Sequence, residues 1–189
     1  MDIRLDGRAA LITGGSEGLG KGMAIKFAGS GADVAILARR QDVLDAAVAE
    51  IDAAGPGKVA AISCDLLDAG ATADAFATAE GALGKIDIVV NNAGTSRAGP
   101  FLTITDEEWH DDFELKLFAA VRLCRLAIPA MQSRKWGRII IVLNIGGKAP
   151  GANGETEEFA NIACFLASDE GGYITGTAIN VDGGRSPVV

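Results

Sequence analysis

The residues best suited to chemistry form a glycine-rich segment near the N-terminus. It lies between an apolar run over 9–13, which predicts a buried strand, and a run over 18–30, which predicts a helix. Glycines there permit a tight turn and let the backbone approach a pyrophosphate, while the helix start supplies free N–H groups. The alternative is an ordinary strand-to-helix turn. We expect a nucleotide-binding loop with contacts from Gly14, Ser16, Glu17, Gly18, Leu19 and Gly20.

Two arginines follow the next predicted strand, over 33–38. In NAD-binding folds an acidic residue at this point accepts hydrogen bonds from the ribose hydroxyls. Here Arg39 and Arg40 stand in its place, and guanidinium groups suit a 2′-phosphate. We therefore expect NADP(H), with Arg39 on the phosphate, while NAD(H) stays possible. The alternatives are that both arginines are simply solvated, and that the carboxylate of Glu17 repels the phosphate unless it points away or pairs with Arg39.

Strands and helices are expected to alternate along the whole chain. The strands are apolar on both faces, which is typical of a parallel sheet covered by helices on both sides. We predict an α/β fold of the Rossmann type, doubly wound with a mainly parallel sheet, as a single domain over 1–189. Pro129 should kink the long helix that begins at Asp106, or begin its end. The strands are expected over 9–13, 33–38, 58–63, 86–91, 138–143 and 178–181, and the helices over 18–30, 41–54, 71–83, from 106, and over 155–167.

Three further segments give the chain a family resemblance. The glycine loop has the spacing Thr-Gly-x-x-x-Gly-x-Gly. It is followed in order by Cys64-Asp65-Leu66, by Asn91-Asn92-Ala93-Gly94, and by a C-terminal Tyr173-Ile174-Thr175-Gly176 with Val181-Asp182-Gly183-Gly184. The chain resembles the short-chain dehydrogenase/reductase family. That resemblance implies NADP(H)-dependent carbonyl reduction or alcohol oxidation on a small molecule, and a homodimer or homotetramer. It places Asp65 and Leu66 at the adenine, and Asn92, Ala93 and Gly94 at the adjoining ribose.

The family's catalytic residues are missing from this sequence. The family protonates the substrate oxygen with a Tyr followed four residues later by a Lys, but here the single Tyr is Tyr173 and the last Lys is Lys148. Gly147 stands where the family has a catalytic Ser, and Lys116 stands where it has an Asn in the long helix. Lys116 is our candidate catalytic residue, as a relocated proton donor or carbonyl electrophile. The alternative is an ordinary helix lysine whose stem lies along the surface.

A segment of the family pattern is absent near 153–156. Family members carry a catalytic helix, a sixth strand and a substrate loop between the fifth strand and the terminal helix. Losing a central strand would expose a sheet edge and an apolar face. We therefore hypothesise that the protein has a segment that the printed sequence omits.

Two other functions compete with that of an oxidoreductase. The first is a nucleotide-binding protein without turnover, acting as a sensor or oligomer partner. The second, a nucleotide-sugar epimerase, ranks last. Ser96 and Arg97 are candidates for substrate contact or for plain loop polarity.

Composition limits the kinds of partner, location and metal or disulfide site that the protein can have. A net charge of −8 disfavours nucleic acid and anionic membranes as partners, because both need clustered Lys and Arg. No apolar stretch reaches membrane-spanning length, and the first six residues carry charges where a signal peptide is apolar, so we expect a cytoplasmic protein. The single histidine, His110, is expected on the surface. No metal site or disulfide is expected from three widely spaced cysteines, Cys64, Cys124 and Cys164.

Overall fold

The computed structural model describes residues 2–95, 99–143 and 155–183. Its centre is a parallel sheet of five strands in the order β3-β2-β1-β4-β5. The chain moves outward from β1 to β3 and then returns to place β4 on the other side of β1. This reversal puts the topological switch point of the sheet between β1 and β4. The strands are β1 (Ala9–Thr13), β2 (Asp33–Ala38), β3 (Val59–Ser63), β4 (Ile88–Asn91) and β5 (Arg138–Ile141).

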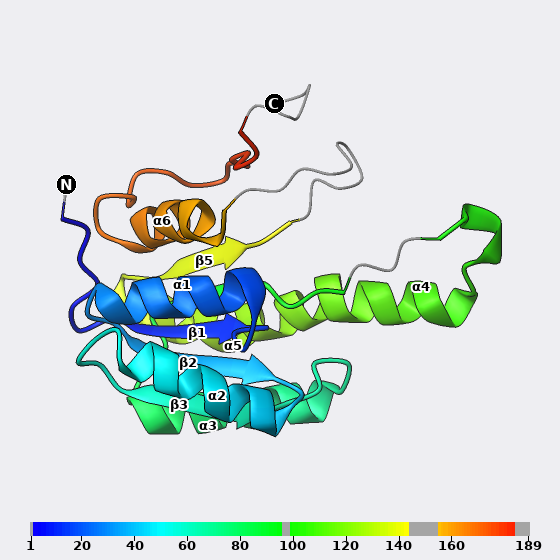
Figure 1. Cartoon of the computed structure of the whole chain (residues 1–189), viewed down its shortest axis with the longest axis horizontal. Coiled ribbons are helices and arrows are strands. Elements are labelled where there is room, and N and C mark those ends of the chain that lie inside the picture. The colour runs from blue at the N-terminus through cyan, green and yellow to red at the C-terminus, as the bar shows by residue number, and fades with distance from the viewer. Residues whose placement is uncertain (1, 96–98, 144–154, 184–189) are drawn as a thin grey trace.

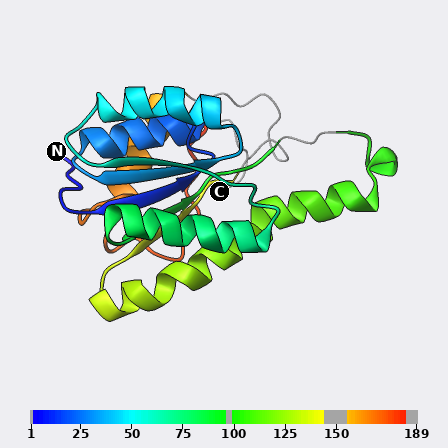
Figure 2. The same cartoon turned by 90° about the horizontal axis from the view of Figure 1, so that it is seen from below.

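Helices cover both faces of the sheet (Figures 1 and 2). One face carries α1 (Gly18–Gly29), α2 (Gln41–Asp52) and α6 (Thr156–Ala167). The other carries α3 (Ala69–Leu83) and α5 (Ala119–Arg134). The predicted doubly wound α/β fold is confirmed.

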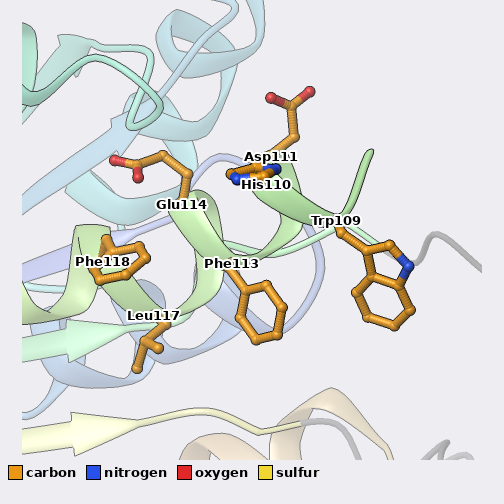
Figure 3. Close-up of a pocket in the computed structure, with 7 residues that line it drawn as sticks. All are labelled: Trp109, His110, Asp111, Phe113, Glu114, Leu117 and Phe118. Carbon is orange, nitrogen blue, oxygen red and sulfur yellow. The ribbon is translucent and has the colours of Figure 1, made fainter. Parts of the chain in front are cut away.

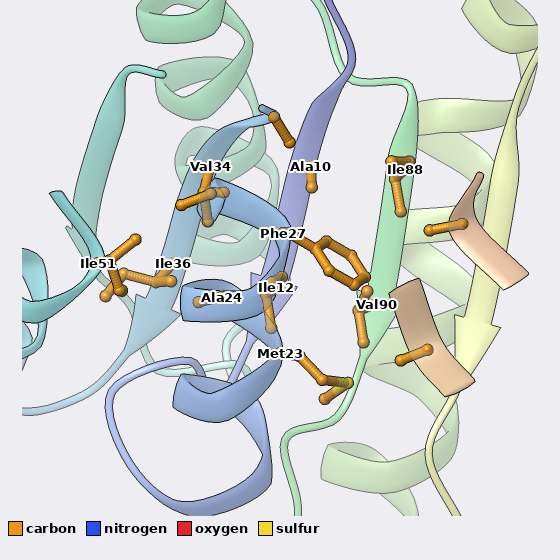
Figure 4. Packing of buried hydrophobic residues seen from close by; sticks show 14 of the residues in the cluster. Ala10, Ile12, Met23, Ala24, Phe27, Val34, Ile36, Ile51, Ile88 and Val90 are labelled. Carbon is orange, nitrogen blue, oxygen red and sulfur yellow. The ribbon is translucent and has the colours of Figure 1, made fainter. Parts of the chain in front are cut away.

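Alternating side chains of the central strands feed two separate cores. Ile12 of β1 and Val90 of β4 lie in the core under α1, with Phe27 and Met23 of that helix (Figure 4). Leu11 of β1 packs instead in the core under α3 and α5. Because both faces of a strand are buried, its sequence is a continuous apolar run rather than an alternating one.

Capping residues set several helix starts. Asp68 accepts hydrogen bonds from Gly70 N–H at 2.7 Å and Ala71 N–H at 3.0 Å, so α3 begins two residues before its predicted start. Thr105 and Glu108 form a reciprocal capping box at the start of α4 (Asp106–Phe113). A short 3-10 helix, η1 (Phe101–Thr103), precedes it. In Figure 1, α4 projects beyond the carboxyl ends of the strands.

The long helix contains an interruption that the sequence did not predict. A π-helical segment, η2 (Glu114–Phe118), joins α4 to α5. Pro129 neither ends the helix nor begins its end, because α5 continues to Arg134. Proline cannot donate the backbone hydrogen bond that a helix needs at this position. Packing of Leu123, Ala127 and Met131 against the sheet compensates for that missing bond and keeps α5 helical.

The prediction of a strand over 178–181 is wrong. These residues form no strand in the structure, and they are largely exposed. A strand needs a neighbour with which to share backbone hydrogen bonds, and β5 lies at the edge of the sheet with no described strand on its outer side. Strands predicted over 58–63, 86–91 and 138–143 also prove shorter. Within the described ranges, no helix is both long enough and apolar enough to cross a membrane.

Candidate nucleotide-binding site

The end of β1 is joined to the end of β4 by a compact set of hydrogen bonds. The buried Thr13 hydroxyl accepts from the backbone N–H groups of Asn92 and Ala93, both at 2.9 Å. The Asn92 side-chain amide donates to the carbonyl oxygens of Thr13, at 2.9 Å, and Gly14, at 3.3 Å. These bonds hold the glycine loop and the Asn-Asn-Ala-Gly turn together at the switch point. Asn92 was predicted as a site residue, but Thr13 was not. The position of Thr13 at the end of the strand could have indicated its role.

Close backbone approach explains one of the loop glycines, and a left-handed backbone conformation explains another. A Cβ on Gly20 would lie 2.1 Å from the Gly14 carbonyl oxygen and 2.6 Å from the Asn92 amide nitrogen, so only glycine fits. Gly18 has φ +54, and a Cβ there would meet open space. The N-cap residue of α1, Glu17, makes no side-chain cap hydrogen bond. The first turn of α1 therefore keeps its N–H groups for an anion from outside. This loop fits the pyrophosphate of a dinucleotide.

The other predicted loop residues surround this turn. Ser16 is buried at 8% exposure, while Glu17 is exposed. Leu19 is half-buried against the core under α1, and Ala93 against the core under α3 and α5. The structure thus brings the loop and the turn together as the sequence predicted.

The two arginines after β2 take different roles. The Arg40 guanidinium forms an ion pair with the Glu17 carboxylate. This pair joins the N-cap residue of α2, Arg40, to the N-cap residue of α1, Glu17. Arg39 is exposed, and its side chain makes no ion pair with another described residue. Its backbone carbonyl accepts a hydrogen bond from Ser63 Oγ at 3.1 Å, which fixes this turn against β3. The carboxylate of Glu17 is therefore paired, with Arg40 rather than Arg39.

Residues after β3 lie on the same edge of the sheet. Asp65 is exposed, and its Oδ1 accepts from the Leu67 N–H at 3.1 Å. Leu66 is buried at 5% exposure in the core under α3. The Leu66 side chain therefore packs inward, which leaves only its backbone for the predicted contact with adenine.

Lys116 lies beside the Asn-Asn-Ala-Gly turn. Its Cε is 3.8 Å from the position that a Cβ on Gly94 would take. Its Nζ is 2.6 Å from Asp112 Oδ1, one helical turn earlier, and its side chain is 44% exposed. Lys116 belongs to the π-helical segment η2, and such segments are frequent at functional sites.

The projecting helix α4 and segment η2 carry an apolar concavity of about 590 Å³. Figure 3 shows Trp109, Phe113 and Leu117 on one side of the helix, and His110 and Asp111 on the other. Trp109 and Phe113 stack with ring centroids 6.0 Å apart. Phe113 and Leu117 are each about half exposed. His110 is exposed, as predicted.

Comparison with known proteins identifies the family. A family model described as short chain dehydrogenase matches residues 8–156. The chain belongs to the short-chain dehydrogenase family. A second model, described as enoyl-(acyl carrier protein) reductase, matches residues 147–186.

Individual short-chain dehydrogenases agree with this assignment. The uncharacterized oxidoreductase YvrD of Bacillus subtilis is 36% identical over 150 residues, which cover 79% of this chain and 56% of that protein. The solved structure of a metagenomic short-chain oxidoreductase in complex with NADP is 30% identical, with a TM-score of 0.78 over 86% of this chain and 91% of that one. The chain spans about half the length of the curated relatives YvrD, a Mycobacterium tuberculosis oxidoreductase and a Pseudocercospora fijiensis dehydrogenase.

A further relative aligns along almost the whole of both chains. The 3-oxoacyl-(acyl-carrier-protein) reductase FabG of Escherichia coli is 26% identical, and the match covers 96% of this chain and 98% of that protein. Its alignment runs over 244 positions, whereas this chain has 189 residues. The relative therefore has additional residues inside the matched region.

Several predicted positions lie outside the described residues. They are Ser96, Arg97, Gly147, Lys148 and the first half of the junction over 153–156. The second half of that junction begins α6, where Thr156 lies so close to α1 that a Cβ on Gly22 would be 2.2 Å from its Cγ2. Tyr173, the chain's single tyrosine, is fully exposed.

Proposed function

We propose that this chain binds NADP(H) at the carboxyl ends of β1 and β4, as an oxidoreductase that reduces a carbonyl or oxidises an alcohol of a small molecule. The observation that carries the proposal is the hydrogen-bonded junction of Thr13 with Asn92 and Ala93. It fixes a glycine loop with an uncapped helix start at the switch point of the sheet, where open α/β sheets bind their ligands. The metagenomic relative, solved with NADP, supports the same cofactor.

In this proposal, different residues of the chain bind different parts of the cofactor. The loop from Gly14 to Gly20 would hold the pyrophosphate, and Asn92 to Gly94 the adjoining ribose. Arg39 would bind the 2′-phosphate, since its guanidinium is exposed and makes no ion pair among the described residues. Asp65 and the backbone of Leu66 would border the adenine. When bound, the nicotinamide supplies or accepts the hydride.

Lys116 is the proposed proton donor to the substrate oxygen. Its stem lies beside Gly94, which supports a position for the ammonium group at the mouth of the proposed site. Asp112 holds that ammonium at 2.6 Å and would fix its direction. A carbonyl that accepts a hydride gains negative charge on oxygen, which a positioned ammonium group stabilises and protonates.

Binding without turnover is the second candidate function. Tyr173, the chain's single tyrosine, is fully exposed in a turn after α6. No Tyr-x-x-x-Lys occurs in the 189 residues. Loss of the family's proton donor with its cofactor loop retained is the expected pattern of a sensor or an oligomer partner.

A further segment between β5 and α6 is also part of the proposal. Ile139 and Ile141 lie on the open edge of the sheet at 38% and 51% exposure. An unprotected apolar edge strand invites aggregation, so natural proteins cover it. The additional residues in the matched region of FabG support the idea that a segment covers this edge. The intact mass of the purified protein tests it, because a mass equal to that of 189 residues would rule out the segment.

Self-association and a cytoplasmic location complete the proposal. The exposed aromatic face of α4 and η2 supports a homodimer or homotetramer, because large apolar patches mark interaction sites. Cys64 and Cys164 are buried free thiols, in keeping with a reducing compartment.

Titration with NADPH, followed by the fluorescence of the nucleotide, tests the function. The wild type should bind NADPH, and Gly20→Ala should lose that binding because its Cβ would strike the Gly14 carbonyl. Gly81→Ala is the matched control, since a Cβ on Gly81 meets nothing within 4 Å. Consumption of bound NADPH over a panel of aldehydes and ketones would support the oxidoreductase. Binding without consumption would support the second candidate, and absence of binding would exclude both.

A further inference from the structure

The ion pair between Glu17 and Arg40 joins the glycine loop, proposed for the pyrophosphate, to the neighbour of Arg39, proposed for the 2′-phosphate. Glu17 is the last residue before α1, and Arg40 is the last residue before α2. Both side chains are more than 60% exposed. Exposed ion pairs contribute little to folding stability, because solvent screens them. A role in folding alone therefore gives a weak reason for this pair.

The pair matters more for the charge that a ligand would meet. Without Arg40, the Glu17 carboxylate would stand as an unpaired negative charge beside Arg39, at the end of β2. A 2′-phosphate carries negative charge, and like charges brought together disfavour binding. The Arg40 guanidinium neutralises that carboxylate and leaves the exposed Arg39 for the phosphate.

We propose that Arg40, by pairing with Glu17, determines the preference of this chain for a 2′-phosphorylated nucleotide. Arg39 is the phosphate ligand, and Arg40 removes the repulsion of the neighbouring carboxylate. Glu17 in turn limits the preference, because it holds a guanidinium that could otherwise bind the phosphate itself. This inference rests on the proposed nucleotide binding.

The structure provides a matched control. Lys21 of α1 pairs with Glu50 of α2 at 2.8 Å, about one turn farther from the glycine loop. This pair also joins α1 to α2, and its side chains are 30% and 54% exposed. It has the same structural role without a place at the strand ends. Glu50→Gln should therefore leave nucleotide preference unchanged.

Dissociation constants for NADPH and NADH, measured by calorimetry on each variant, test the proposal. Arg40→Gln should raise the constant for NADPH on the order of tenfold and change that for NADH little. Glu17→Gln should lower the constant for NADPH, because Arg40 becomes free to bind the phosphate. The double variant should lie near the wild type, since neither the repelling charge nor the neutralising one remains.

The outcomes separate this inference from the function on which it rests. If the wild type binds both nucleotides but the ratio of the two constants is the same in Arg40→Gln, Glu17→Gln and Glu50→Gln, the pair is only a structural contact and the inference is wrong. If the wild type binds neither nucleotide, the proposed function fails and the inference with it. Thermal unfolding of each variant confirms that a changed ratio does not reflect a damaged fold.

Discussion

The buried Thr13 hydroxyl and the half-buried Asn92 backbone N–H are joined by a hydrogen bond of 2.9 Å. Thr13 ends β1, and Asn92 follows directly after β4. The same hydroxyl accepts a second bond from Ala93 N–H and donates to the Val90 carbonyl at 3.3 Å. One side chain thus satisfies three backbone groups of the neighbouring strand and its turn. The shape of the proposed nucleotide site depends on this single hydroxyl.

Replacing Thr13 with valine should destabilise the protein and weaken NADPH binding together. Valine keeps the shape but leaves the two partly buried N–H groups unpaired, and an unpaired N–H group costs about 1–3 kcal/mol when it is fully buried. The free energy of unfolding, measured by urea denaturation, should fall by a few kcal/mol. Thr13→Ser keeps the hydroxyl and should stay close to the wild type. Equal losses in the valine and serine variants would show that the methyl group, and not the hydroxyl, is responsible.

Acid should release the contact that holds the end of α6 to the sheet. Asp169 accepts hydrogen bonds from the Trp136 indole N–H at 2.8 Å and from Arg8 at 3.1 Å, and Arg8 lies over the Trp136 ring. The bond from Trp136, and then the charge of Arg8, lower the pKa of this carboxyl below its ordinary value of 3.8. The stabilisation is therefore complete above that value and is lost as the pH falls through the lower pKa of the folded state.

Asp169→Asn isolates this effect. At neutral pH it should lower the free energy of unfolding by about 1 kcal/mol or less, because the carboxylate is largely exposed. The difference from the wild type should shrink as the pH falls below 3.8. Urea denaturation at several pH values, followed by tryptophan fluorescence, measures this difference. Asp52→Asn, at an exposed site on α2, controls for loss of a negative charge. A difference that persists at low pH would contradict the assigned role.

The sequence was sufficient for the parts of the site that local chemistry determines. A glycine loop between a strand and a helix has one favourable geometry, so Gly18 and Gly20 could be placed from spacing alone. The partner of Glu17 could not be placed, because Arg39 and Arg40 are adjacent and the turn decides which one reaches it. The strand predicted over 178–181 failed for a different reason, since pairing depends on a neighbour that the local sequence does not contain. Pro129 lies inside α5, which continues to Arg134, because tertiary packing can outweigh a residue's helix-breaking tendency.

The aromatic face of α4 and η2 should govern self-association. Phe113 is 52% exposed at its centre and stacks on Trp109. Phe113→Asp should shift the protein towards the monomer, because a buried unpaired charge disfavours an apolar interface. Size-exclusion chromatography with light scattering reports the change. Leu102→Asp is the control, since Leu102 is 93% exposed in η1, outside that face. Equal effects of both substitutions would indicate general damage, and a monomeric wild type would exclude the interface.

Replacing Lys116 with methionine should separate catalysis from binding. If the Lys116 ammonium protonates the substrate oxygen, Lys116→Met should lower kcat with a carbonyl substrate by about 100-fold or more. The dissociation constant for NADPH should change little, because Lys116 lies beside Gly94 and not in the glycine loop. Asp112→Asn should give a smaller loss, since it keeps the proton donor and removes only the carboxylate that holds it.

Lys58→Met, at an exposed position next to β3, controls for the loss of a positive charge. The kcat and KM of each variant, together with NADPH titrations, decide the matter. A wild-type kcat in Lys116→Met would show that the lysine is an ordinary helix residue, and the proton would then have to come from another group. A fall in kcat with unchanged NADPH binding would place the proton transfer at Lys116 in the π-helical segment.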